Sequence, residues 1–309
     1  MILATLPYPQ LDPVLLQLGP LTLRWYALAY VAGLVLAWAG IVRMLRNKRL
    51  WSAPPFNGKP PATEDDIGDL VVWATFGVII GGRLGWDLFY GIILCSTTPD
   101  ASGFCHNLPG DFLIHPWRLI AEWNGFVPML QGMSFHGGLI GVIVAIWLFC
   151  RKRKLPLLSV ADLAAAWAPI GLFFGRIANF VNGELWGRIT DSPMGMVFCS
   201  KYFPGIYGTP CPGGPYPRHP SQLYEAALEG IVLFAILQLG LRLFGWQRRP
   251  GLMAAVFFAG YGLFRFLVEF VREPDAPFVG FLTMGMFLSL LVWAAAAALF
   301  YAALKPKAA

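Results

Sequence analysis

Seven long apolar runs constrain most strongly what this chain can fold into. Each is about 20 residues long, which is the length that an α-helix needs to cross the hydrocarbon core of a membrane. They lie at about Leu21–Met44, Ile67–Leu94, Gly132–Cys150, Val160–Val181, Ser221–Phe244, Leu252–Val271 and Phe281–Leu304. Hydrophobic residues make up 57% of the chain and charged residues only 13%. We therefore predict an all-α polytopic membrane protein with about seven transmembrane helices, built as a single integral-membrane domain over residues 1–309.

Basic residues follow the first, third, fifth and seventh runs, so all four clusters fall on one side of the predicted membrane. They comprise Arg43, Arg46, Lys48 and Arg49, then residues 151–154, then Arg248 and Arg249, and finally Lys305 and Lys307. Loops rich in Lys and Arg stay in the cytoplasm. We therefore expect a cytoplasmic C-terminus, an outward N-terminus and two long outward loops, at about residues 95–128 and 185–218. The net charge of +6 follows from these clusters and does not indicate nucleic-acid binding.

Each outward loop contains two cysteines. Cys95 and Cys105 share the first loop, and Cys199 and Cys211 share the second. Cysteines outside the cytoplasm tend to form disulfides, and a pair within one loop closes a short ring. We expect one disulfide within each loop; pairing between the loops and reduced thiols are the alternatives.

The stretch Gly175–Arg188 ends the fourth run and carries two arginines, two asparagines and a glutamate. A charge at the middle of a membrane costs about 2.5–3.5 kcal/mol on insertion scales, so such groups need partners or a function. Further polar residues occupy the outward ends of five other runs. With this stretch they comprise Tyr26, Arg83, Asp87, His136, Arg176, Asn179, Glu184, His219, Gln222, Tyr224, Glu225, Glu229, Tyr261, Arg265 and Glu269. Their shared depth predicts an anion site, because arginine holds phosphate through two parallel hydrogen bonds.

Each of these residues also has a simpler explanation. Arg265 and Glu269 are spaced by four and form an ordinary ion pair on that interpretation. Gly137, Gly138 and Gly141 serve only close helix packing on this interpretation, and His136 is a buried histidine with its hydrogen bonds satisfied. These explanations leave the coincidence at one depth unexplained. The carboxylates of Asp69 and Asp162 are exceptions, since they lie at the opposite ends of their runs, where they favour a helix N-terminus.

Four motifs, in this order, resemble those of the bacterial prolipoprotein diacylglyceryl transferases. They are the stretch Ser134–Gly141, the stretch Gly175–Arg188, the stretch His219–Glu225, and Gly260–Arg265 followed by Glu269. The resemblance covers most of the chain, from about Leu21 to the seventh run. The seventh run departs from the family pattern, because Met286 stands where a glutamine is expected after Met284 and Gly285.

The resemblance implies an enzyme that transfers diacylglycerol from phosphatidylglycerol to the lipobox cysteine of prolipoproteins, with loss of glycerol phosphate. It implies a multi-pass protein of the bacterial inner membrane, with its active site at the periplasmic leaflet and no metal, nucleotide or other cofactor. Its partners are phosphatidylglycerol, the prolipoprotein signal peptide and membrane lipids. By residue-for-residue match, the catalytic candidates are His136, Arg265, Tyr26 and Glu184. The candidates for phosphatidylglycerol binding are Arg176, Arg265, Asn179 and Tyr261, with Gly137, Gly138, Gly187, His219, Tyr224 and Glu269 in support.

The expected chemistry begins with the substrate thiol, because only its thiolate attacks well. His136 is the candidate base, since an ordinary histidine titrates near neutral pH; Glu184, Tyr26 and Tyr261 are alternatives. Arg176 and Arg265 are expected to stabilise the charge that develops on the departing phosphate. A transporter or flippase for an anionic lipid, an intramembrane protease and a non-catalytic module are the competing functions. A transporter predicts polar residues through both leaflets, whereas here they gather at one side.

Overall fold

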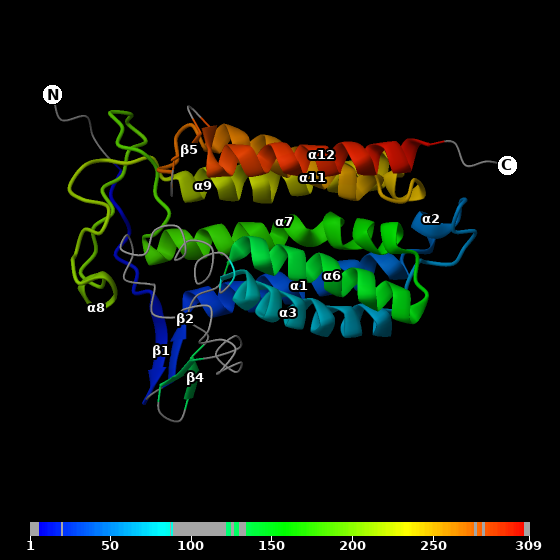
Figure 1. Ribbon diagram of the computed structural model, residues 1–309, viewed down its shortest axis with the longest axis horizontal. Coiled ribbons are helices and arrows are strands. Elements are labelled where there is room, and N and C mark those ends of the chain that lie inside the picture. Colours follow the sequence, from blue (N-terminus) through cyan, green and yellow to red (C-terminus); the bar gives the residue numbers. More distant parts are fainter. Residues whose placement is uncertain are drawn as a thin grey trace. The chain divides into compact units, whose positions relative to one another are not determined.

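The computed structural model describes residues 6–19, 21–86, 88, 122–124, 127–129, 134–274, 277–279 and 282–305. For residues 21, 122–124, 127–129, 135, 136 and 277–279 it describes only the backbone. The described part is mostly helical (Figure 1). Its long helices are α1 (Trp25–Arg46), α3 (Glu64–Trp86), α6 (Phe135–Arg153), α7 (Leu157–Asn182), α11 (Leu252–Val268) and α12 (Met284–Leu304). A further helix over Ser221–Phe244 comprises α9 (Ser221–Glu225), the π-helical η3 (Ala226–Val232), α10 (Leu233–Leu239) and the π-helical η4 (Gly240–Phe244).

Within the residues that the structure describes, five helical segments are long and apolar enough to cross a membrane. They are Trp25–Arg46, Glu64–Trp86, Leu157–Asn182, Ser221–Phe244 and Met284–Leu304. The other two expected places hold α6, with 19 residues, and α11, with 17 residues. The chain is thus a polytopic membrane protein, and a total of seven crossings stays a prediction.

Short antiparallel hairpins correct the all-α expectation. Strand β2 (Leu21–Arg24) pairs with β1 (Val14–Leu18), so the first helix begins at Trp25 and not at Leu21. Gly19, at φ +57°, provides the turn between these strands. Two more hairpins pair β3 (Glu122–Asn124) with β4 (Val127–Met129), and β5 (Pro277–Val279) with β6 (Leu282–Thr283). The short helices α2 (Lys48–Trp51) and α8 (Pro204–Tyr207) and the 3₁₀ turn η5 (Trp246–Arg248) complete the described elements.

The chain divides into two compact units, of which one is Pro61–Val160. In this unit α3 and α6 lie side by side with their backbones in contact (Figure 1). A Cβ atom added to Gly77 would lie 2.6 Å from the carbonyl oxygen of Gly141, and one added to Gly85 would lie 2.7 Å from the Cα atom of Gly137. Such contacts are typical of membrane helices that associate through small residues. The simpler explanation of Gly137, close packing, therefore holds.

The other unit comprises Met1–Pro60 and Ala161–Ala309. Here α1 packs on α7, because a Cβ atom on Gly33 would lie 3.0 Å from the Cα atom of Gly171. Side-chain hydrogen bonds to backbone carbonyls connect its other helices. Gln238 of α10 donates to the Ala166 carbonyl of α7 at 3.1 Å. Trp293 of α12 donates to the Ala259 carbonyl of α11 at 3.1 Å, and these two helices run side by side (Figure 1).

The two carboxylates at the far ends of their runs do not cap their own helices. Asp162 lies inside α7 and accepts hydrogen bonds from the backbone N–H groups of Gly251, at 2.7 Å, and Ala254, at 2.9 Å. It therefore caps the N-terminus of α11. Asp69 lies inside α3 and forms an ion pair with Arg153 of α6. The expected association of Asp162 with a helix N-terminus is therefore present, but the helix is α11 and not its own; for Asp69 the expectation was wrong.

Candidate active site

Three arginines and three glutamates form one ion-paired cluster within the unit of Met1–Pro60 and Ala161–Ala309. The helices α7, α9 with η3, and α11 supply them, and the residues directly after α11 complete the set. The members are Arg176, Glu225, Glu229, Arg265, Glu269 and Arg272. These charged residues are separated by up to 96 positions in the sequence. They lie together because α7 and α11 end close to where α9 begins.

Glu225 lies at the centre of this cluster, and its side chain is fully buried. Its Oε1 atom is 2.5 Å from Nη1 of Arg265 and 3.1 Å from Nη1 of Arg272. Its Oε2 atom is 3.2 Å from Nη1 of Arg176. A single carboxylate balances one of three positive charges, so the arginines keep an excess positive charge that other anions must neutralise.

Glu229 and Glu269 supply the other two negative charges. Arg176 directs Nε and Nη2 at one oxygen of Glu229, Oε2, at 3.4 and 3.2 Å. Arg265 directs Nη2 at Oε2 of Glu269 at 2.9 Å, which is the ion pair expected from their spacing. Thr283 donates a hydrogen bond to Oε1 of Glu269 at 2.9 Å. Near the unexpected Met286, whose own side chain is buried, the polar contact to Glu269 therefore comes from Thr283.

Tyr261 belongs to the same cluster. It precedes Arg265 by one helical turn, so both lie on one face of α11. Its phenol interacts electrostatically with Glu229 and Arg176. The expected association of Tyr261, Arg265 and Arg176 is present, although the arginines already contact carboxylates.

A second group of polar side chains surrounds the C-terminus of α7. Asn179 donates a hydrogen bond to Oε1 of Glu184 at 2.8 Å, and the Glu184 carbonyl accepts one from Gln222 at 2.5 Å. The Tyr26 hydroxyl interacts with both Asn179 and Glu184, and it lies 3.2 Å from the hydroxyl of Tyr30. Three predicted site residues, Tyr26, Asn179 and Glu184, therefore lie together. They come from α1 and from the end of α7.

The chain after α7 is joined to the end of α11 by backbone hydrogen bonds. Gly187 donates to the His219 carbonyl at 2.8 Å, and Arg188 donates to the Val271 carbonyl at 2.8 Å. A Cβ atom on Gly187 would lie 2.5 Å from the Val271 oxygen, so only glycine fits there. His219 contacts the Tyr224 hydroxyl through Nδ1 at 3.3 Å, and partial burial lowers the pKa of its ring. Gly187, His219 and Tyr224 thus support the loop that borders the cluster.

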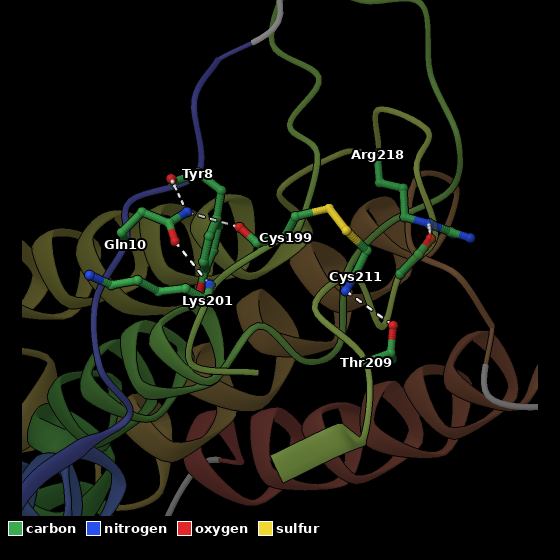
Figure 2. Close-up of a disulfide and its surroundings, with 8 residues drawn as sticks. Tyr8, Gln10, Cys199, Lys201, Thr209, Cys211 and Arg218 are labelled. Carbon is green, nitrogen blue, oxygen red and sulfur yellow. Dashed lines mark hydrogen bonds between the residues drawn. A yellow bond between two sulfur atoms is a disulfide. The ribbon is translucent and has the colours of Figure 1, made fainter. Parts of the chain in front are cut away.

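A disulfide and an aromatic core stabilise this loop. Cys199 and Cys211 are bonded, as expected for a pair within one loop (Figure 2). Gln10 donates a hydrogen bond to the Cys199 carbonyl at 3.0 Å, so the chain ahead of the first helix also contacts this loop (Figure 2). The buried core beneath comprises Tyr8, Phe180, Met196, Phe198 and Phe203. The expected pair of Cys95 and Cys105 lies outside the described residues.

His136 and Gly138 lie in the other unit. The backbone of His136 forms the first turn of α6, which begins after the N-cap Ser134, and its side chain is outside the described part of the structure. Gly138 makes only ordinary contacts with α3, at 3.7 Å from the Val78 carbonyl oxygen. The role of His136 as a base stays a prediction. Among the residues that the structure describes, no group of His, Cys, Asp and Glu side chains is arranged to hold a metal ion.

Glu225 and Glu229 were predicted to lie at the depth of the anion site but were given no catalytic or binding role, and Arg272 was not predicted at all; the three hold half of the charges in the cluster. One signal for the two glutamates was available. They are two carboxylates spaced by four inside an otherwise apolar run, where each requires a cation. Arg272 follows its run, where an arginine is common at a membrane boundary, so nothing in its sequence context distinguishes it.

Comparison with known proteins places this geometry in a family. The profile of the family described as "Prolipoprotein diacylglyceryl transferase" matches residues 13–302. The phosphatidylglycerol–prolipoprotein diacylglyceryl transferase of Caulobacter vibrioides is 48% identical over 293 residues, which cover 92% of this chain and 90% of that protein. The enzyme of the same name from Rhizobium meliloti is 46% identical, over 93% of this chain and 90% of that protein. The chain therefore belongs to the prolipoprotein diacylglyceryl transferase family.

Proposed function

We propose that this protein transfers the diacylglyceryl group of phosphatidylglycerol to the cysteine thiol of a prolipoprotein. Its membership in the transferase family, over more than nine-tenths of its length, is the main support. The buried cluster around Glu225 is the structural observation that carries the proposal, because three guanidinium groups converge there. The thiol attacks the glycerol carbon, a thioether forms, and the carbon–oxygen bond to the phosphate breaks to release glycerol phosphate.

Arg176 and Arg265 are the proposed phosphate ligands. Their side chains are only 14% and 13% exposed, so they act in a medium of low dielectric constant, where a cation stabilises a developing negative charge more strongly than in water. Each is held by two carboxylates of the cluster, Arg176 by Glu225 and Glu229 and Arg265 by Glu225 and Glu269. Such preorganisation keeps the cost of reorienting the arginines small when charge moves onto the phosphate oxygen.

The thiol proton is assigned to a separate group of residues. His136 is the proposed base. Tyr26, Asn179 and Glu184, which lie together in the other unit, are proposed as further residues of the thiol step. The hydrogen bond from Asn179 to Glu184 supports this part of the proposal, because it fixes the carboxylate in one orientation. Gly137 and Gly138 position the first turn of the helix that carries His136.

The proposed location is the bacterial inner membrane, with the N-terminus in the periplasm and the C-terminus in the cytoplasm. The positions of the basic clusters support this orientation. So does the disulfide between Cys199 and Cys211, because disulfides persist in oxidising compartments. In this orientation the arginine cluster lies at the periplasmic leaflet. There it can receive the lipid headgroup and the signal peptide with its lipobox cysteine.

The test combines purified protein, phosphatidylglycerol and a synthetic lipobox peptide. The expected products are a peptide that is heavier by one diacylglyceryl group, resistant to thioester cleavage, and free glycerol phosphate, both detected by mass spectrometry. Arg176→Ala is the inactive control and Arg249→Ala, in an exposed basic cluster, is the matched active one. An unmodified peptide in the presence of folded protein would contradict the proposal. Movement of the lipid between leaflets without peptide modification would favour a flippase.

A further inference from the structure

Glu229 differs from the other two carboxylates of the cluster. Its side chain is fully buried, yet among the described residues it forms an ion pair only with Arg176, and only through Oε2. In the same part of the chain its other oxygen, Oε1, has neither a hydrogen bond nor an ion pair. The Oε2 atoms of Glu225 and Glu269 also lack a hydrogen bond, but they form ion pairs with Arg176 and Arg265. A buried carboxylate oxygen without a partner loses its hydration without compensation, which is unfavourable unless the atom serves a ligand or carries a proton.

The charge of the cluster changes when a phosphate binds. Its three guanidinium groups and three carboxylates balance each other, so the ion-paired set is neutral. A phosphodiester brings one more negative charge. Two like charges about 4 Å apart repel by about 4 kcal/mol at an effective dielectric constant of about 20. Uptake of one proton by a carboxylate would restore neutrality.

Glu229 is the carboxylate that can accept this proton with the least disruption. Glu225 contacts three arginines, and Glu269 contacts Arg265 and Thr283, so protonation of either would weaken several interactions. The charged and titratable groups that face Glu229 are Arg176, Arg265, Glu225 and Tyr261. If the phosphate replaces Glu229 as the hydrogen-bond partner of Arg176, Glu229 loses its positively charged neighbour. The negative charge of Glu225 still faces it. Both conditions favour the neutral acid.

We propose that Glu229 takes up one proton when the arginines bind the phosphodiester of the lipid, and that the resulting carboxylic acid donates a hydrogen bond to the phosphate. This inference rests on the proposed function. It makes Glu229 a ligand of the phosphate group, in its neutral form, in addition to Arg176 and Arg265. In this proposal Glu229 of the free protein is the ionised partner of Arg176.

The proton then has a defined destination. As the thiol sulfur bonds to the glycerol carbon and the carbon–oxygen bond breaks, Glu229 transfers its proton to the departing phosphate oxygen. Glycerol phosphate leaves as a monoanion, and Glu229 returns as the carboxylate that pairs with Arg176. The thiol proton leaves through the base, so one proton enters with the lipid and one departs from the thiol. The overall reaction neither consumes nor releases a proton.

Calorimetric titration with a short-chain phosphatidylglycerol tests the proton uptake directly. The wild-type protein in detergent is titrated in two buffers of different ionisation enthalpy, so that proton uptake appears as a difference in observed heat. Uptake of about one proton per bound lipid is expected at a pH where the free carboxyl is ionised. Glu229→Gln should bind the lipid without uptake. Glu273→Gln, at a half-exposed surface carboxylate, should keep the wild-type uptake.

Several outcomes would overturn this inference. Binding by the wild-type protein without proton uptake refutes it while leaving the transferase proposal intact. Equal proton uptake by Glu229→Gln and wild type also refutes it, because another group must then accept the proton. Absence of any lipid binding by the folded wild-type protein refutes both proposals together. The wild-type measurement alone suffices if Glu229→Gln does not fold.

Steady-state kinetics supply a second measurement that a merely structural role would not reproduce. Glu229→Gln keeps the neutral shape but has no proton to transfer, so kcat should fall about 10²-fold while KM for the lipid stays equal or decreases. Glu229→Asp keeps an acid and should recover part of kcat. A fall in kcat that Glu229→Asp does not reverse, with no proton uptake by wild type, argues for packing alone.

Discussion

The contact between α3 and α6 in one unit and the contacts among α7, α9 and α11 in the other are made mainly by different means. Between α3 and α6 the contact is backbone on backbone, through glycines that leave no room for a side chain. Between α7, α9 and α11 the contact is made by buried arginines and glutamates. Glycine contacts stabilise through close packing and carry no charge. Buried ion pairs are expensive to desolvate, so their concentration in one place indicates that the charges serve the reaction as well as the fold.

The largest effect is expected when Glu225, the residue at the centre of the ion-paired cluster, is replaced. Glu225→Ala removes the carboxylate shared by three arginines and leaves Arg176 with Glu229 and Arg265 with Glu269 in a buried site. Removing one partner of a buried ion pair costs about 3–5 kcal/mol of stability, and here we expect the upper part of that range. Thermal unfolding in detergent measures it. A loss below about 1 kcal/mol would show that the cluster contributes as little as ion pairs at the surface.

The next largest effect is expected in the glycine contact. Gly81→Ala places a Cβ atom 2.7 Å from the Cα atom of Gly141, so α3 and α6 must separate. Overpacking of this kind costs about 1–3 kcal/mol. Gly68→Ala is the matched control on the same helix, because nothing lies within 4 Å of its added Cβ atom. It should leave the unfolding temperature unchanged or raise it. Equal destabilisation by both substitutions would exclude helix contact as the cause.

A smaller loss of stability is expected at Asp162, whose carboxylate accepts hydrogen bonds from backbone N–H groups and not from arginine. Asp162→Asn keeps one acceptor for the start of α11 but loses the charge that the N–H groups of Gly251 and Ala254 stabilise. Loss of a good N-terminal cap costs about 1 kcal/mol. The unfolding temperature should fall less than in Glu225→Ala, and transferase activity should persist. Loss of activity without loss of stability would show that Asp162 acts at the site.

The smallest effect is expected in the pH dependence of stability, through His219 in the loop that borders the ion-paired cluster. Burial lowers the pKa of His219 from its ordinary value of 6.5, so folding favours the neutral ring. This contribution to stability is complete above the ordinary pKa and is lost as the pH falls through the lowered one. The unfolding temperature should therefore fall from pH 7.5 to 5.5 slightly more in wild type than in His219→Gln. Identical falls would contradict a role for His219.

The difference between the two units also explains what the sequence could predict. Length and hydropathy were sufficient to locate the helices, because the membrane demands a minimum apolar length. Gly137 and Gly141 were visible as a small-residue pattern, and the structure places both in a helix contact. The long-range partners of Arg176 were not predictable. Spacing along the sequence determines which residues share a helix face. It does not determine which of several carboxylates at the same membrane depth pairs with a given arginine.

The corrections have the same cause. Asp162 is close to the start of its own helix, and only the packing of α7 against α11 reveals that it caps the other one. Leu21–Arg24 is apolar enough to extend the first helix, but pairing with Val14–Leu18 converts it into a strand. Both outcomes depend on contacts that are distant in the sequence. Tertiary contacts of this kind override local propensity.

The side chain of Tyr8 has a practical consequence for handling the protein. Its hydroxyl donates hydrogen bonds to the carbonyls of Phe180 and Val181, at 2.7 and 3.1 Å, in the last turn of α7. The last turn of the helix that carries Arg176 is thus held by a residue more than 170 positions earlier in the chain. A purification tag or a truncation close to Tyr8 would disturb the phosphate site from a distance. A change at the exposed Lys305 would not, because Lys305 follows the end of α12 opposite to Thr283, the residue that contacts Glu269.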